Sequence, residues 1–218
     1  MKERLDTLLT AARRHQLLAV GASAALAIAL LAGRMVHVRS HAFAFLAWNL
    51  ILAFIPWSVS FFATSVKSEW RWLLLPVWLV FFPNAPYLVT DFVHLRSRPP
   101  VPVWYDVGML TSFAWAGLLC AVTSLGAVHS EVERSAGRAA GWLFVAGVSS
   151  LTGYGIYLGR FLRKNSWDVL LDPLDLARTL ASPLLNPAEQ FRTFVVAALF
   201  GSLMLVVYGA FRTRPTAP

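Results

Sequence analysis

Charged residues are scarce in this sequence. Of its 218 residues only 14% are charged and 57% are hydrophobic, whereas an ordinary soluble domain has about 25% charged residues. A soluble fold of this size could not hide so much apolar surface, because it leaves roughly a third of the area of its unfolded chain in contact with water. The shortage excludes a soluble globular enzyme and a disordered chain, and it indicates a protein whose solvent is a lipid bilayer.

Cysteine is nearly absent, since Cys120 is the only one and lies inside an apolar run. This excludes a disulfide framework and a thiolate metal site, and we expect Cys120 to pack in the interior. Acidic residues are also few, 11 against 19 Lys and Arg, which gives a net charge of +8. The basic residues form short clusters between apolar runs. They therefore indicate membrane-flanking anchors and no nucleic-acid partner.

Long apolar runs are abundant. A helix needs about 20 mostly apolar residues to cross a hydrocarbon core of about 30 Å. Six stretches approach this length, at about 15–33, 42–63, 70–90, 104–128, 140–160 and 190–211. We predict an all-α bundle of about six transmembrane helices, forming a single integral-membrane domain over residues 1–218. The first run lacks a convincing cleavage site and is followed by Arg34, which is typical of a retained span.

The basic residues also bear on orientation. Lys2, Arg4, Arg13 and Arg14 precede the first span and favour a cytoplasmic N-terminus, although the two sides carry nearly equal numbers of basic residues overall. The segments 91–103 and 161–189 are separated by two spans. They must therefore lie at the same membrane face, whichever face that is, and we call it the shared face.

Prolines interrupt the third span in the sequence Phe81-Phe82-Pro83-Asn84-Ala85-Pro86-Tyr87. Proline removes a backbone donor and disfavours helical geometry in the residue before it, so we predict a break at Pro83–Pro86. Irregular backbone at membrane depth is tolerated where it is buried in protein or lines a wet cavity. Asn84 could bind the freed backbone groups or a ligand. A kink healed by neighbouring helices is the alternative.

Small and capping residues mark two further features. Gly137 and Gly141, like Gly155 and Gly159, have the four-residue spacing that lets helix backbones approach closely. We expect this packing within the monomer rather than in a dimer. The sequence Asn186-Pro187-Ala188-Glu189 predicts the start of the sixth span, with Asn186 as the N-cap residue.

Polar residues collect in segments of the shared face. Asp91 and His94 are three residues apart, so they share one side if that stretch is helical. An Asp–His pair can act as general base and orienting group, and carboxylate and imidazole groups suit a divalent cation. Arginine grips a phosphate or carboxylate with two parallel hydrogen bonds. Asn49 of the second span is expected to reach the broken third span. The histidines at span ends are expected at the membrane interface: His15, His37, His41 and His129.

These residue types define three sets of candidates. The catalytic candidates are Asp91, His94 and Asp106. The metal candidates are Asp91, His94, Asp106 and Asp168, with a divalent metal ion as the candidate cofactor. The candidates for binding an anionic ligand are Asn84, Tyr87, Tyr105, Arg160, Arg163, Asn165 and Asp168. The structural alternative is that the basic residues reach the headgroups or form ion pairs with these carboxylates.

Several of these blocks resemble one known family. Phe81–Tyr87, Thr90–Leu95, Trp104–Asp106 and Gly155–Asp168 are similar to the signature blocks of a bacterial multi-pass membrane family, catalogued as domain of unknown function 1361. The resemblance runs from about Asn49 to Asp168, with Lys164 where the family pattern has an aromatic residue. It implies a bacterial plasma (inner) membrane protein, and it brings no established activity.

The sequence therefore predicts an integral membrane protein that binds an anionic, phosphate-bearing lipid or lipid-linked ligand at the shared face. A transferase or hydrolase acting on the headgroup is an alternative, and it requires Asp91, His94 and Asp106 to converge. A transporter or flippase requires a polar track to the opposite face. A structural assembly protein requires each charge to be paired locally. The expected partners are membrane lipids, with a second copy of the chain as a further candidate.

Overall fold

The computed structural model describes residues 2–65, 70–185 and 191–212, and this part of the chain is almost entirely helical. The helices are α1 (Lys2–Val38), α2 (Phe45–Ser65), α3 (Trp70–Phe81), α4 (Asn84–Tyr87), the 3-10 helix η1 (Leu88–His94), α5 (Val103–Ala136), α6 (Arg138–Phe161), α7 (Asp168–Leu171), α8 (Pro173–Leu185) and α9 (Phe191–Phe211). The all-α prediction is confirmed.

Six helical segments are long and apolar enough to cross a membrane: Arg14–Val38, Phe45–Ala63, Leu73–His94, Val103–Ala136, Arg138–Phe161 and Phe191–Phe211. They correspond in order to the six predicted runs, although α5 continues past residue 128 to Ala136. The predicted helix start at Asn186–Glu189 lies outside the described residues. The single-domain assignment stays a prediction.

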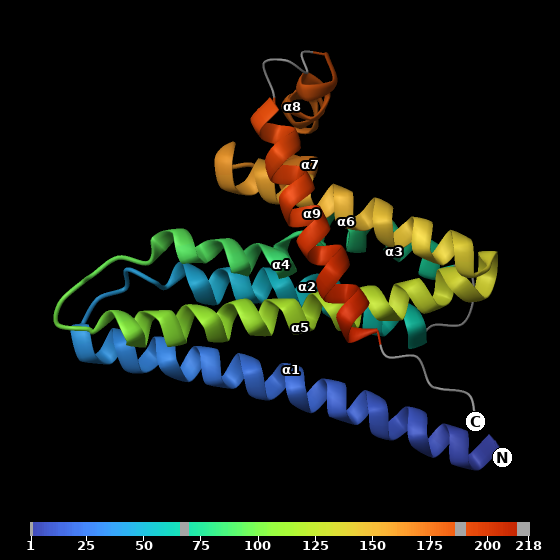
Figure 1. The fold of residues 1–218 in the computed structure, drawn as a ribbon, viewed down its shortest axis with the longest axis horizontal. Helices are drawn as coiled ribbons and strands as arrows, with labels where there is room; N and C mark the ends of the chain where they lie inside the picture. The colour runs from blue at the N-terminus through green and yellow to red at the C-terminus, as the bar shows by residue number, and fades with distance from the viewer. Residues whose placement is uncertain (1, 66–69, 186–190, 213–218) are drawn as a thin grey trace.

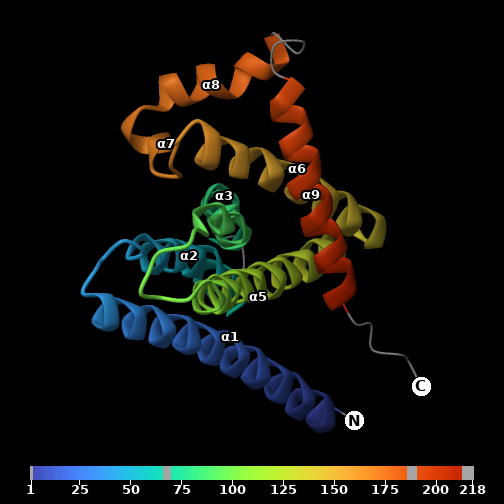
Figure 2. The ribbon, with the colours of Figure 1, turned by 60° about the vertical axis from the view of Figure 1, so that its left-hand side comes forward.

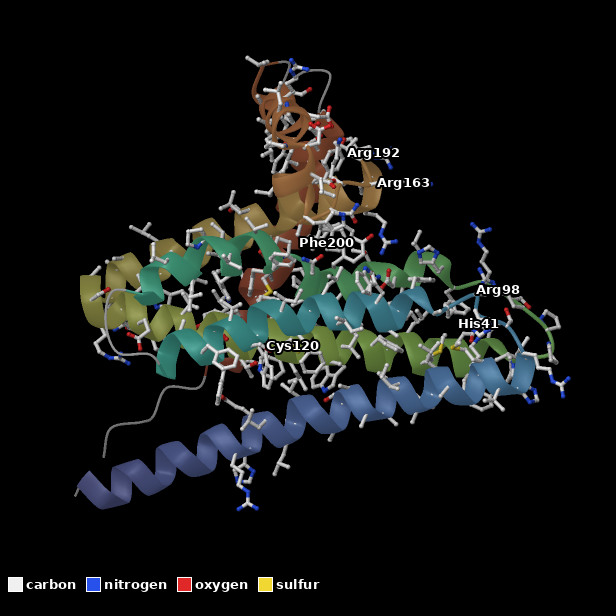
Figure 3. All side chains as sticks on the ribbon, turned by 180° about the vertical axis from the view of Figure 1, so that it is seen from behind. His41, Arg98, Cys120, Arg163, Arg192 and Phe200 are labelled. Atoms are coloured by element: carbon white, nitrogen blue, oxygen red, sulfur yellow. The ribbon has the colours of Figure 1, made fainter. Side chains whose placement is uncertain are left out.

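Helix α5 is the centre of the bundle, because α1, α2, α4, η1 and α6 all pack against it. Figures 1 and 2 show α1, α2 and α5 running side by side, while α9 crosses steeply and packs on α6. The core around α5 is rich in large side chains such as Trp78, Phe82 and Phe113. Cys120 is buried there as expected (Figure 3). The outward faces carry exposed apolar residues such as Leu143 and Leu199, as expected for helices that contact lipid.

The third span breaks where the prolines predict. Helix α3 ends at Phe81, and the chain continues through α4 and the tighter η1. The Ala85 N–H bonds the carbonyl of Phe82 instead of that of Phe81, which a continued α-helix would use. The Phe81 carbonyl accepts a hydrogen bond from Asn84 Nδ2 instead, at 2.9 Å. Asn84 therefore satisfies backbone that the break sets free.

Glycines allow α6 to lie close to its neighbours. A Cβ on Gly155 would come within 2.7 Å of Pro83 Cγ, and one on Gly159 within 3.1 Å of the Tyr87 ring. These contacts lie within the chain, as expected for close packing inside the monomer. Gly137 has a different role, because its φ of 88° ends α5 and starts α6 with open space around its Cβ position.

The tightest helix contact joins α6 to α9. A Cβ on Gly153 would collide with the Ala197 carbonyl oxygen and lie 2.7 Å from Gly201 N, and one on Gly201 would lie 2.9 Å from the Ser149 carbonyl oxygen. Each glycine therefore accommodates the backbone of the opposite helix.

This contact predicts opposite outcomes for two glycines of α6. Gly153→Ala should destabilise the protein by about 1–3 kcal/mol, because the added methyl group forces the two helices apart. Gly147→Ala is the matched control, since nothing lies within 4 Å of its Cβ position. Thermal unfolding in detergent measures both variants. Equal midpoints for Gly153→Ala and the control would contradict the close contact.

Candidate functional site

A buried ion pair between Asp91 and Arg160 joins the broken third span to α6. Asp91 is only 1% exposed, and its Oδ1 accepts a hydrogen bond from Arg160 Nη2. Its Oδ2 accepts a second bond, of 3.0 Å, from Asn49 Nδ2 on α2. Asn49 thus reaches the broken span as expected. Three elements meet at one carboxylate, which neutralises a charge that would be costly to bury alone.

The Arg160 guanidinium is surrounded by further partners from η1 and α4. Its Nε donates to Thr90 Oγ1 at 3.0 Å, and its Nη1 lies 3.1 Å from His94 Nε2. Because a guanidinium can only donate, His94 Nε2 must be the acceptor. The guanidinium also stacks over the Tyr87 ring, with Cζ 4.4 Å from the ring centroid. The structure therefore brings together Tyr87, Asp91, His94 and Arg160 of the predicted set.

Asp106 and Tyr105 do not join this group, because the first turn of α5 directs them to α1. Asp106 is fully buried and forms a two-bond ion pair with Arg34, Oδ1 to Nε at 2.6 Å and Oδ2 to Nη2 at 3.1 Å. The Tyr105 hydroxyl donates to the Leu30 carbonyl oxygen at 2.8 Å. The structure thus gives no support for Asp106 beside Asp91 and His94. Arg34 was treated only as a flanking charge in the sequence.

The predicted metal set is not assembled either. Within the described ranges, no three His, Cys, Asp or Glu side chains form a group that could hold a metal ion. Asp106 is bound to Arg34, and Asp168 Oδ2 accepts the backbone N–H of Asn165 at 2.7 Å, where it stabilises the turn before α7. Within the described residues, Asp91, His94, Asp106 and Asp168 therefore do not converge on one point, because their side chains bind different neighbours.

The segment after α6 carries two cations with different surroundings. Arg163 is exposed and lies at the outer surface beyond the end of α6, with a left-handed φ of 55° (Figure 3). Lys164 forms an ion pair with Asp175 of α8, and this hydrogen bond raises the pKa of Lys164 above its usual value. Lys164 is therefore charged at neutral pH.

A cavity of about 400 Å³ lies next to the Asp91–Arg160 pair, between α2, α3, α4, α6, the 164–169 segment and α8. Three of the predicted ligand-binding residues line it: Asn84, Tyr87 and Asn165. Most of the remaining wall is apolar, and it includes Leu52, Leu79, Leu151, Leu158, Leu176 and Leu180. Asn49 and Tyr87 contact both the ion-pair group and the cavity. The broken span thus lines a cavity, which is one of the two surroundings in which irregular backbone is tolerated in a membrane protein.

Asn84 links the break to the far wall of this cavity. Besides its bond to Phe81, its Nδ2 donates to Ser166 Oγ at 2.9 Å, and Ser166 Oγ donates to the Val80 carbonyl oxygen at 3.1 Å. The ring of Trp167 lies 6.2 Å from that of Trp48 on α2. These contacts place the 164–167 segment against the broken span, as the prediction of a shared face requires.

A second polar cluster, around His129, was not predicted, because His129 was expected at the membrane interface. That expectation was wrong, because His129 is fully buried between α5, α6 and α9. The Tyr208 hydroxyl lies 2.7 Å from His129 Nδ1 and accepts a hydrogen bond from Arg212, which also pairs with Glu133. The four-residue spacing of His129 and Glu133 on one helix side was the available signal.

Six helices that are long and apolar enough to cross a membrane define an integral, multi-pass membrane protein. The chain belongs to the family described as "Protein of unknown function (DUF1361)", which matches residues 48–207. The match includes Asn49, Asp91, Arg160 and the whole cavity, and it leaves α1 outside. No curated protein and no solved structure matches the chain significantly.

The Asp91–Arg160 pair predicts a strong loss of stability when either partner is removed. Asp91→Asn or Arg160→Gln should each cost about 3–5 kcal/mol, because an unpaired charge or unsatisfied group is left buried. The double variant should cost less than the sum of the two. Arg163→Gln is the control at an exposed arginine three residues away. Thermal unfolding in detergent tests this, and single variants as stable as the control would contradict a structural pair.

Proposed function

We propose that this protein binds an anionic, phosphate-bearing lipid or lipid-linked molecule in the cavity beside the Asp91–Arg160 pair. The observation that carries this proposal is the change from polar to apolar cavity lining along α6. Lys164, Asn165 and Ser166 follow the end of α6, whereas Leu151 precedes Phe161 by ten residues. At 1.5 Å per residue, Leu151 lies about 15 Å deeper along the helix.

The cavity lining is polar near the end of α6 and apolar further along the helix, and an amphiphile has the same two parts, a polar head and an apolar chain. Leucines of α2, α3 and α6 supply an apolar wall for a hydrocarbon chain, and amide, hydroxyl and ammonium groups of Asn84, Ser166 and Lys164 supply hydrogen bonds near the membrane face. A ligand site of this type is typically apolar with a few polar groups that fix the orientation. An acyl or isoprenoid chain with a charged head would satisfy both parts.

The charge balance favours Arg163 and Lys164 as the anion-binding residues. Arg160 already donates to Asp91, Thr90 and His94, so its charge is neutralised within the protein. Arg163 is exposed and precedes the lining residues in sequence, whereas Lys164 lines the cavity and forms an ion pair with Asp175 of α8. A phosphate group could compete with the Asp175 carboxylate for this ammonium group. We therefore propose that Arg163 binds the anionic head of the ligand, whereas Arg160 holds Asp91, Thr90 and His94 in position beside the cavity.

A transferase or hydrolase at the same headgroup has weaker support. Both oxygens of Asp91 accept hydrogen bonds from Asn49 and Arg160, and His94 Nε2 accepts from Arg160. These two groups are therefore engaged with the protein, and Asp106 is paired with Arg34. The arrangement fits binding better than proton transfer. We also propose a bacterial plasma membrane location with the N-terminus in the cytoplasm, on the basis of the flanking charges and the family resemblance.

Lipid copurification tests the proposed function. The purified protein should retain phosphate-bearing lipid after detergent exchange, detected by mass spectrometry of the intact complex. Arg163→Gln with Lys164→Gln should reduce retention roughly tenfold, the equivalent of one lost charged hydrogen bond.

Two tryptophan substitutions on α8 distinguish lipid bound in the cavity from lipid adsorbed on the protein surface. Leu180→Trp fills the cavity from α8 and should displace the lipid, whereas Leu174→Trp changes an exposed leucine of the same helix and should leave retention unchanged. Equal lipid retention in both variants, or no retained lipid in the unaltered protein, would overturn the proposed function.

A further inference from the structure

Helix α8 lies between two spanning helices without being long enough to span. It has 13 residues, a length of about 20 Å, and it connects the end of α6 to the start of α9. Figure 2 shows α7 and α8 extending across one end of the molecule, from the end of α6 to the start of α9. Because α6 and α9 are each long and apolar enough to cross a membrane, we expect α8 between them to lie at or near a membrane face.

A hydrogen bond from Tyr154 of α6 fixes where α8 lies along the length of α6. Pro183 has no N–H, so the carbonyl of Thr179, four residues earlier, has no intrahelical donor. The Tyr154 hydroxyl lies 3.4 Å from that oxygen and 3.2 Å from the Leu180 carbonyl oxygen. Tyr154 precedes the end of α6 by seven residues, or about 10 Å. The middle of α8 is therefore held close to the end of the span and not far out in water.

The two sides of α8 differ in polarity. Asp175, Arg178, Thr179 and Ser182 follow one side at helical spacing, whereas Leu176 and Leu180 line the cavity. Leu174 and Leu185 are 11 residues apart, about three turns, and so lie on one side of the helix. They are 62% and 75% exposed. Leu171 of α7, three residues before Leu174, is 76% exposed.

We propose that α8 is an in-plane amphipathic helix that docks into the interface of the membrane leaflet. Leu174 and Leu185 lie at the boundary between headgroups and acyl chains, and Arg178 lies among the headgroups. The leaflet is the occupant because the spans on both sides of α8 are surrounded by the same lipid. Exposed arginines near the ends of α6 and α9, Arg163 and Arg192, suit anionic headgroups (Figure 3). This inference does not require that the cavity bind a ligand.

Nitroxide accessibility in lipid vesicles tests this docking. The native chain is a suitable background, because its one cysteine, Cys120, is buried. Leu174→Cys and Leu185→Cys are labelled one at a time and reconstituted into vesicles of phosphatidylethanolamine and phosphatidylglycerol. Collision with oxygen, which concentrates in lipid, is compared with collision with a water-soluble nickel chelate. Leu199→Cys, exposed in the middle of α9, is the lipid reference, and Ser97→Cys, exposed in the loop before α5, is the aqueous reference.

The expected result is an oxygen-to-nickel ratio at positions 174 and 185 that is closer to that of Leu199→Cys than to that of Ser97→Cys. A ratio closer to that of Ser97→Cys at both positions would overturn the inference, because α8 would then lie in water. A split result, with only one position in lipid, would also overturn docking along the whole helix. Lipid loss in the Leu180→Trp variant is measured separately, so failure of the cavity proposal leaves this test intact.

Discussion

The buried contact between Asp91 and Arg160 is the interaction on which the arrangement of this protein depends. An unpaired charge inside a helix bundle in a membrane costs several kcal/mol, so each of these residues fixes the position of the other. The contact connects η1 to α6, and Asn49 adds α2 through the second carboxylate oxygen. The cavity lies among these same elements. The contact therefore helps to hold the cavity walls at their spacing.

The proline break makes that contact geometrically accessible. A straight third span would continue as an α-helix through Asp91, whereas the chain here tightens into a 3-10 helix after Tyr87. Asn84 satisfies the backbone at the break and connects it to Ser166, and Gly155 and Gly159 let α6 approach Pro83 and Tyr87. Backbone irregularity, small residues and a buried charge thus act together. Each would be unfavourable without the others.

Most of the buried charged groups in the described part of the chain form ion pairs or hydrogen bonds between helices, and the proposed ligand site is the cavity. Arg34 with Asp106 ties α1 to α5, and the group around His129 ties α5 to the end of α9. Hydrogen bonds satisfied within the protein leave little capacity for chemistry at these positions. The 164–166 segment differs, because it places an ammonium, an amide and a hydroxyl group along an apolar cavity. This distribution of polar groups is the basis of the proposed binding role.

Hydropathy and proline placement were sufficient to predict the six apolar helices and the break near Pro83, because these follow from helix length and backbone chemistry. The shared face of the 91–103 and 161–189 segments stays a prediction that follows from connectivity. Proximity of Asp91, His94 and Arg160 was predictable from that parity. The choice of ion-pair partners was decided only by the tertiary structure. Asp106 turns to Arg34, and His129 is buried instead of interfacial. The rotation of each helix about its own axis selects these partners, and packing between the helices fixes that rotation. In a membrane the lipid and the protein interior are equally apolar, so the pattern of apolar residues in the sequence specifies the rotation only weakly.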